Sequence, residues 1–230
     1  MTTRAKLRLL VAVLACAGAV PLLATERATW TLESALKQLD RVSSRFEGAV
    51  ADVELTAVDA AGAEPRSGSG KAYFDRGGAV RFDLSSPDEK TLLSTGQDLY
   101  VYEPARAIVE QFAVDKHPER LEPYASLGFS LSGNGLQKDY VVSLLGEESI
   151  GDHKTLVLEL TPRSDEMRSA VSRIQLWIGE ASWLPVQQKI YHGGAGIYIQ
   201  VRYRDVSKDV PLEQSLFKPK WPKGTETVKR

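Results

Sequence analysis

The residue types that most often perform catalysis are scattered along this chain. The three histidines, His117, His153 and His192, lie near predicted turns or strand ends, far apart in sequence. Neither an HExxH motif nor a cysteine pair accompanies them, so the sequence predicts no metal site. Serine, histidine and aspartate are all present, but no nucleophile-elbow motif presents a serine. We therefore expect neither an enzyme nor a bound cofactor.

Two polar stretches that resemble functional motifs have simpler interpretations. The "GGAG" run at residues 193–196 lacks the Lys-Ser/Thr pair of a phosphate-binding loop and lies between two predicted strands. It is typical of a hairpin turn. Asp165 and Glu166 follow Arg163 in a polar stretch, which predicts a solvated loop.

Arg76 is the charged residue with the most distinctive position. It follows Ala72 and Phe74 at alternate positions of a predicted strand, so its guanidinium would lie at the rim of an apolar face. One interpretation is a long side chain that reaches along the apolar surface to water. The other is a donor to the free carbonyls of a neighbouring helix end, since a guanidinium carries five N–H groups.

The first 24 residues have the layout of a secretory signal. Arg4, Lys6 and Arg8 precede "LLVAVLACAGAVPLLA", which ends in small residues. This apolar stretch of about 16 residues is shorter than the ~20 that span a bilayer. We expect a signal peptide at residues 1–24 and a mature domain at residues 25–230. Cys16, the only cysteine, stands in "VLAC", which resembles a lipidation box, so a lipoprotein signal is the alternative.

The charge balance argues against nucleic acid as a partner. The chain holds 29 Lys and Arg against 30 Asp and Glu, and 43% of it is hydrophobic, an ordinary globular composition. Loss of the first 24 residues would remove three basic residues and no acidic one, which leaves a net charge of −4. The sequence also contains no basic stripe.

Hydrophobic spacing predicts one helix followed by many strands. Leu32, Leu36 and Leu39 recur at helical spacing within residues 29–46, although Thr31 and Ser34 look like poor caps. The rest alternates between apolar and polar residues, with turns at Gly and Pro. Strands are expected near residues 53–57, 68–76, 79–84, 91–94, 99–103, 107–114, 140–146, 154–162, 173–179, 184–191 and 197–206. So many closely spaced strands favour an antiparallel barrel or sandwich over an α/β fold.

Two segments within this β pattern are informative. In residues 85–104, Leu99 and Val101 fall on one face, and Tyr100 and Tyr102 fall on the other. Both faces are therefore expected to contact protein rather than bulk water. Residues 117–140 break the alternation and predict short helical pieces with an apolar face. We expect this insert to form a lid over the mouth of the sheet.

The stretch "DRGGAVRFDLSSPDEKTLLSTGQDLYVYEP" resembles the core segment of LolA-type outer-membrane lipoprotein carriers, and "FKPKWPKGTETV" resembles the closing motif of that family. The resemblance implies a mainly β (α+β) fold: an unclosed antiparallel β-barrel or half-barrel with an N-terminal helix and a short helical lid over an apolar cavity. It also implies a monomeric periplasmic carrier that binds the acyl chains of lipoproteins. Its implied partners are acylated lipoproteins, an inner-membrane lipoprotein-releasing ABC transporter and an outer-membrane acceptor.

Two other functions fit the same fold. The chain would be an outer-membrane acceptor lipoprotein if Cys16 is lipidated, or else a lipid-sensing regulatory module. Such sensors usually carry a further domain, for which this chain looks too short.

The resemblance also assigns roles to individual residues. Arg76 matches the arginine that hydrogen-bonds the lid in the closed state of the family. The usual following proline is replaced by Gly77, and Asp75 replaces a basic neighbour and is expected to be able to pair with Arg76. The residues expected to line the lipid cavity are apolar and come from the early strands and the lid segment: Phe74, Val80, Phe82, Leu84, Leu99, Val101, Leu121, Tyr124, Leu127 and Phe129.

Overall fold

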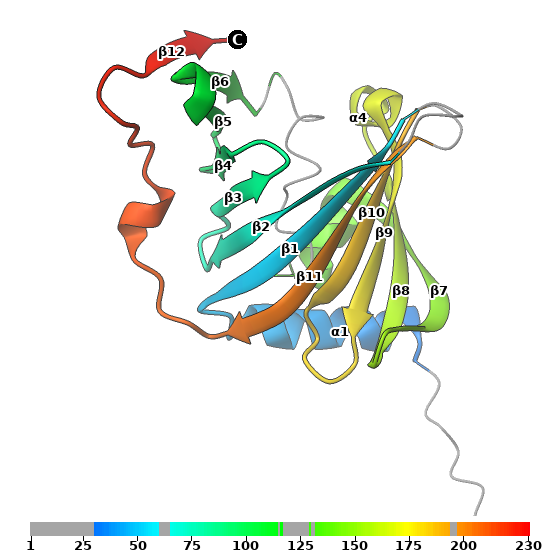
Figure 1. The fold of residues 1–230 in the computed structure, drawn as a ribbon. Helices are drawn as coiled ribbons and strands as arrows, with labels where there is room; N and C mark the ends of the chain where they lie inside the picture. The colour runs from blue at the N-terminus through cyan, green and yellow to red at the C-terminus, as the bar shows by residue number, and fades with distance from the viewer. Residues whose placement is uncertain (1–29, 60–64, 115, 117–128, 130–131, 194–196) are drawn as a thin grey trace, which may run out of the picture.

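The computed structural model describes residues 30–59, 65–114, 116, 129, 132–193 and 197–230. Their fold is a single curved sheet with a few short helices (Figure 1). The helical elements are α1 (Leu32–Ser43), η1 (Pro104–Arg106), α3 (Gly133–Asp139), α4 (Asp165–Ala170) and η3 (Gln214–Phe217). The strands are β1 (Gly48–Val58), β2 (Arg66–Asp75), β3 (Val80–Ser86), β4 (Lys90–Ser94), β5 (Asp98–Glu103), β6 (Ile108–Ala113), β7 (Tyr140–Ile150), β8 (His153–Pro162), β9 (Val171–Gly179), β10 (Pro185–His192), β11 (Tyr198–Lys208) and β12 (Glu226–Lys229).

The strand order shows that the barrel does not close. The 12 strands are arranged as β12-β6-β5-β4-β3-β2-β1-β11-β10-β9-β8-β7, with β12 and β7 at the two edges. The predicted strands are all present, and the mainly β, unclosed architecture is confirmed. In the centre of the sheet β1 pairs with β11, so the first and the last long strands of the chain are neighbours.

The sheet differs from the expected antiparallel one at its last strand. β12 pairs with β6 in the parallel direction, which makes the sheet mixed. The reason is the path of residues 209–225, which run from the end of β11 past η3 to the far edge of the sheet, as Figure 1 shows in orange and red. We call residues 209–225 the C-terminal strap.

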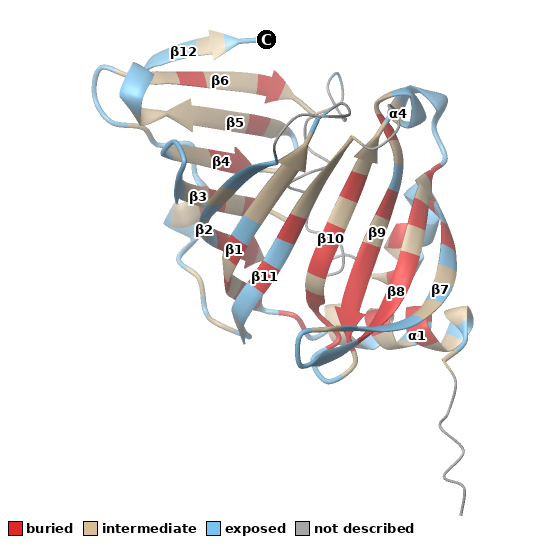
Figure 2. Cartoon of the chain, turned by 45° about the vertical axis from the view of Figure 1, so that its right-hand side comes forward, coloured by how far each residue is buried: buried red, intermediate tan, exposed pale blue. Residues whose placement is uncertain are grey.

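The two faces of the sheet pack against different parts of the chain. We call the inner face the one that carries Phe74, Phe82 and Leu176, and the outer face the opposite one. On the inner face, β8, β9 and β10 pack against α1 and α3, and these strands hold many of the buried residues in Figure 2.

On the outer face, the strap covers β3, β4 and β5. The Arg81 Nη1 donates to the Leu216 carbonyl at 3.2 Å, and the Trp221 ring lies 5.1 Å from that of Tyr102 and 6.1 Å from that of Tyr100. The prediction that both faces of residues 85–104 contact protein is confirmed.

The helix α1 is amphipathic, as its leucine spacing predicts. Ala35, Leu36 and Leu39 are buried in the core it forms with β8 and β9. Its start corrects the expectation of poor caps: the Thr31 Oγ1 accepts from the Ser34 N–H at 3.2 Å, and the Ser34 Oγ accepts from the Thr31 N–H at 3.0 Å. Serine thus fills the place that Glu or Gln has in the usual capping box, because its hydroxyl can also accept a hydrogen bond.

The shorter helices also bear on the sequence predictions. Within residues 117–140, α3 is the helical piece that the structure describes, and most of the remaining segment lies outside the described residues. Asp165 and Glu166 form the first turn of α4 rather than a loop. The Ser164 Oγ accepts from the Met167 N–H at 3.1 Å, and acidic residues at a helix start are favoured by the helix dipole. The helices in the described ranges are all too short or too polar to cross a membrane.

The contact between α3 and α1 depends on Gly133. A Cβ atom at this position would lie 2.5 Å from the Leu36 carbonyl oxygen and 2.9 Å from its carbonyl carbon. Next to it, the Asn134 N–H donates to the Asp40 carboxylate at 3.1 Å. The two helix backbones therefore approach as closely as they do because this position has no side chain.

We expect Gly133→Ala to destabilise the protein by about 1–3 kcal/mol, because backbone atoms must shift to admit the methyl group. At an ordinary helix position the same change is stabilising by about 1 kcal/mol, so the sign of the effect is diagnostic. Chemical denaturation measures it. Asn134→Ala, an exposed change on the same helix that keeps the backbone donor, is the control and should change stability by less than about 0.5 kcal/mol. A stabilised Gly133→Ala variant would contradict the close approach.

Candidate functional site

Five aromatic rings pack together on the inner face over β1, β2, β3 and β11. We call Phe46, Phe74, Phe82, Phe129 and Tyr203 the inner aromatic cluster; each is at most 4% exposed. Phe129 stacks face to face on Phe74, with ring centroids 3.8 Å apart and planes 6° from parallel. It also contacts Tyr203 at 5.0 Å and Phe46 at 6.5 Å, while Phe82 meets Phe74 edge to face at 6.1 Å. Phe129 therefore lies at the centre of the cluster.

Short side chains on the two central strands make room for these rings. Ala51 and Ala72 pair across β1 and β2, and Ala49 pairs with Phe74. All three alanines are buried in the same core as the aromatic cluster. Because alanine extends only one carbon from the backbone, the rings can lie low over this part of the sheet. The local sequence thus produces an apolar hollow that aromatic side chains occupy.

The structure brings together the predicted cavity residues that it describes. Phe74, Val80, Phe82 and Phe129 are buried in one core, and Leu84 and Val101 pack against its margin. Leu99 is also buried and lies on the same face of β5 as Val101. Leu121, Tyr124 and Leu127 lie outside the described residues. These positions are shared by a packed core and a lipid cavity, so their role in lipid binding stays a prediction.

Arg76 lies at the exposed end of the β2–β3 hairpin. Its Nη1 donates to the Glu47 carboxylate at 2.8 Å, and both side chains are more than half exposed. Asp75 is engaged elsewhere: its Oδ2 accepts from the Gly77 N–H at 2.8 Å, and its Oδ1 accepts from the Gln214 side chain at 3.0 Å. Among the described residues, the carboxylate that binds Arg76 is therefore that of Glu47. The gating role of Arg76 stays a prediction.

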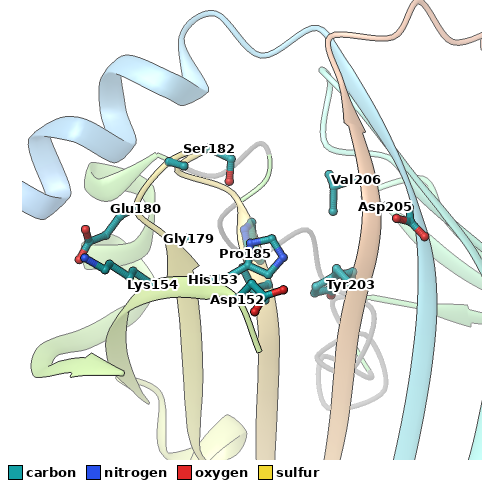
Figure 3. Close-up of a pocket in the computed structure, with 12 residues that line it drawn as sticks. Asp152, His153, Lys154, Gly179, Glu180, Ser182, Pro185, Tyr203, Asp205 and Val206 are labelled. Atoms are coloured by element: carbon teal, nitrogen blue, oxygen red, sulfur yellow. The ribbon is translucent and has the colours of Figure 1, made fainter. Parts of the chain in front are cut away.

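A cavity of about 690 Å³ lies beside the aromatic cluster, between β10 and β11 (Figure 3). One wall is the turn at residues 179–182 with Pro185 and Val186. The other wall is the end of β11, with Tyr203, Asp205 and Val206. The tip of the β7–β8 hairpin, residues 152–154, completes the rim. Tyr203 belongs both to this β10–β11 cavity and to the inner aromatic cluster, so the two are adjacent.

The sequence analysis missed the contributions of Tyr203 and Phe46 to this site. Tyr203 alternates with Val201 in "IYIQVRYRDV", and this pattern marks an inward-facing row once the strand is recognised. Phe46 was assigned to the helix face, but it follows the end of α1 and reaches the cluster from the connection to β1. Its position depends on where the helix ends, which spacing alone does not define.

Tyr203 carries a polar group in this apolar environment. Its hydroxyl is buried and has no hydrogen-bond partner. Burial raises the pKa of Tyr203 above its ordinary value, because the anionic form loses its hydration. The described residues contain no group of three or more His, Cys, Asp or Glu side chains that could hold a metal ion. The chemistry of the site is thus apolar contact with isolated polar groups.

Comparison with known protein families gives one match. The profile of the family described as "Outer membrane lipoprotein carrier protein LolA" matches residues 44–220, which is more than half of the chain. This range includes β1–β11, the inner aromatic cluster and the β10–β11 cavity. No curated protein sequence matches the chain significantly.

Solved structures with low sequence identity share the fold. An uncharacterized conserved protein from Thermus thermophilus is 11% identical with a TM-score of 0.56, and the match covers 86% of this chain and 98% of that one. A LolA superfamily protein from Nitrosomonas europaea is 16% identical with a TM-score of 0.43, over 82% of this chain and 98% of that one. A putative outer membrane lipoprotein-sorting protein domain from Vibrio parahaemolyticus is 15% identical with a TM-score of 0.45, over 82% and 97% of the two chains.

The buried hydroxyl of Tyr203 predicts a specific pH dependence of stability. A tyrosine in the unfolded chain ionises near pH 10, whereas the raised pKa of Tyr203 keeps it neutral in the folded protein. Its contribution to the free energy of unfolding is therefore fully present below about pH 10 and is lost as the pH rises above that value. In Tyr203→Phe, the loss of stability between about pH 10 and 12 should become smaller.

Urea denaturation at several pH values measures this effect. At pH 7 the variant should be equal to the wild type or up to about 1 kcal/mol more stable, because an unsatisfied buried hydroxyl is removed. Tyr102→Phe, which removes a hydroxyl from the outer face beside Trp221, is the control and should keep the wild-type decline. An unchanged decline in Tyr203→Phe would show that this hydroxyl is not buried in solution.

Proposed function

Because the chain belongs to the LolA family of outer membrane lipoprotein carrier proteins, we propose that it binds the acyl chains of lipoproteins on its inner face and carries them between the two membranes. The observation that supports this most directly is the inner aromatic cluster. It places a removable apolar side chain, Phe129, in a hollow formed by the sheet. An acyl chain makes the same kind of contact as the Phe129 ring.

The energetics of acyl chains explain what such a carrier must provide. Burial of each CH₂ group contributes about 0.8 kcal/mol, so a chain of ~15 methylenes represents about 12 kcal/mol. A lipoprotein with two or three such chains does not cross an aqueous compartment unaided at a useful rate. A carrier needs an apolar surface of comparable quality, and it must exchange cargo by direct contact with donor and acceptor proteins.

The position of Phe129 suggests how the binding site is kept closed without cargo. Its ring contacts Phe46, Phe74 and Tyr203, and it is fully buried. Displacement of this ring would open the hollow over the alanines of β1 and β2. Bound acyl chains replace the lost contacts, so occupied and empty forms both bury the apolar surface.

Localisation and partners follow from the same proposal. Residues 1–24 act as a signal peptide that is removed on export to the periplasm, and residues 25–230 form the carrier domain. An inner-membrane lipoprotein-releasing ABC transporter supplies the cargo, and an outer-membrane acceptor receives it. The intact mass of the exported protein tests this assignment: a free amino terminus near residue 25 supports the carrier, whereas a lipid on Cys16 supports the acceptor.

We expect Phe129→Ala to bind acyl chains more tightly than the wild type, because no ring has to be displaced. Exposure of a buried phenylalanine costs about 1.5–3 kcal/mol, which corresponds to roughly a tenfold or larger gain in affinity. Competition with a fluorescent palmitoyl probe measures the dissociation constant. The variant should also lose about 3–5 kcal/mol of stability in the absence of lipid.

Phe217→Ala is the matched control for this experiment. Phe217 is also buried, but it lies in η3 of the strap and outside the inner core. Its removal should reduce stability without a gain in acyl-chain affinity. An equal affinity of Phe129→Ala and the wild type would show that acyl chains do not bind where Phe129 packs.

Arg76→Leu tests the proposed gate. It should accept lipoprotein from the donor but transfer it slowly to the acceptor, because hydrogen bonds to charged groups contribute about 1.5–3 kcal/mol to the closed state. A two-step assay of loading and transfer measures both steps. Glu47→Gln is the control: it removes the exposed ion pair but keeps the guanidinium. If both variants are defective in transfer to the same extent, the ion pair matters and not the contact with a lid; normal transfer by Arg76→Leu would exclude the gate.

A further inference from the structure

The edge of β11 beside the cavity has free backbone groups. β10 and β11 pair from Tyr191 with Tyr198 to Gln187 with Arg202, and there the pairing ends. β11 continues to Lys208 and pairs with β1 along this extension. In the part of the chain that the structure describes, residues 203–206 therefore have a strand on one side only. Such an open edge offers N–H and C=O groups to an added strand.

The opposite strand diverges instead of closing this gap. β10 starts at Pro185, which has no N–H to donate, and its pairing with β9 shifts register between Pro185 and Gln187. Pro185 and Val186 line the cavity across from Tyr203 and Val206, as Figure 3 shows. The result is a slot with apolar walls along an open strand edge. This combination suits a polypeptide segment in an extended conformation.

The charges at the rim indicate which segments fit best. Asp152, Glu180 and Asp205 contribute carboxylates to the cavity lining, whereas Lys154 contributes one ammonium group. The rim is thus acidic at neutral pH. It favours an extended segment with lysine or arginine over one with glutamate or aspartate.

Tyr203 connects this slot to the acyl-chain site. Its ring is part of the inner aromatic cluster, and the same residue lines the β10–β11 cavity. A lipoprotein carries its acyl chains on one residue, and its polypeptide chain continues from that residue. With the acyl chains in the hollow, this polypeptide has to leave close by.

We propose that the β10–β11 cavity binds the polypeptide segment that follows the lipidated residue of a cargo lipoprotein, as an added strand on residues 203–206 of β11. This inference rests on the proposed acyl-chain binding and adds to it a second, sequence-sensitive contact. The carrier would thereby hold its cargo at two adjacent places, through lipid and through peptide.

Three synthetic probes separate the two contacts. The first is a dipalmitoylated cysteine followed by a short serine- and lysine-containing peptide, the second has glutamate in place of lysine, and the third is dipalmitoylglycerol without peptide. We expect the lysine probe to bind about threefold to tenfold more tightly than the glutamate probe at low ionic strength. Added salt should reduce this ratio.

Substitution of the rim carboxylates should remove the preference. In the double variant Asp152→Asn, Asp205→Asn, the affinity ratio of the lysine and glutamate probes should fall towards one, while dipalmitoylglycerol binds as before. Asparagine is suitable at position 205 because the residue there has φ of 48°, which asparagine tolerates. The matched control is Asp88→Asn, Glu89→Gln in the exposed β3–β4 turn, which should keep the wild-type ratio.

Amide hydrogen exchange on the wild-type protein reports strand addition directly. The lysine probe should slow exchange at residues 203–206 by at least about tenfold relative to dipalmitoylglycerol, since added strands protect their partner's amides. If both lipids bind but these amides and the affinities are indifferent to the peptide, the slot proposal is wrong and acyl-chain binding stands. If no probe binds, both proposals are wrong.

Discussion

The face-to-face stack of Phe129 on Phe74 fixes the relation between the sheet and the segment that crosses its inner face. A single ring between β6 and α3 contacts residues from β2, β11 and the connection after α1. Dispersion and the hydrophobic effect stabilise this arrangement, with no hydrogen bond between the rings. The same non-directional contacts suit the proposed exchange of a ring for an acyl chain. A polar core would require exact partners, which a flexible lipid does not supply.

Local pattern was sufficient to predict the architecture. Period-two alternation identified the strands from β1 to β11, and leucine spacing identified α1. The same alternation placed Phe74, Phe82, Leu99 and Val101 on one face of the sheet, because side-chain direction in a strand follows from position alone. Hydrophobic periodicity is a property of short segments, so one sequence contains it.

What the sequence did not predict depends on contacts between distant residues. Glu47 is 29 positions from Arg76, and nothing local indicates that these two side chains meet. The parallel pairing of β12 with β6 depends on the path of the strap, and the β10–β11 cavity depends on where two strands stop pairing. The helix α4 was missed for another reason: a Ser cap and an acidic first turn were interpreted as loop polarity. Propensities over six residues are weak signals.

The pairing of β1 with β11 has a consequence for how the chain folds. Arg204 and Glu54, which form an ion pair across these strands, are 150 positions apart in sequence. Contacts of such long sequence separation slow folding, because a large loop must close before they contribute stability. The centre of the sheet also waits for the last third of the polypeptide, so an incomplete chain cannot form it. For a protein that is proposed to cross a membrane before it folds, this delay keeps the emerging chain in a translocatable state.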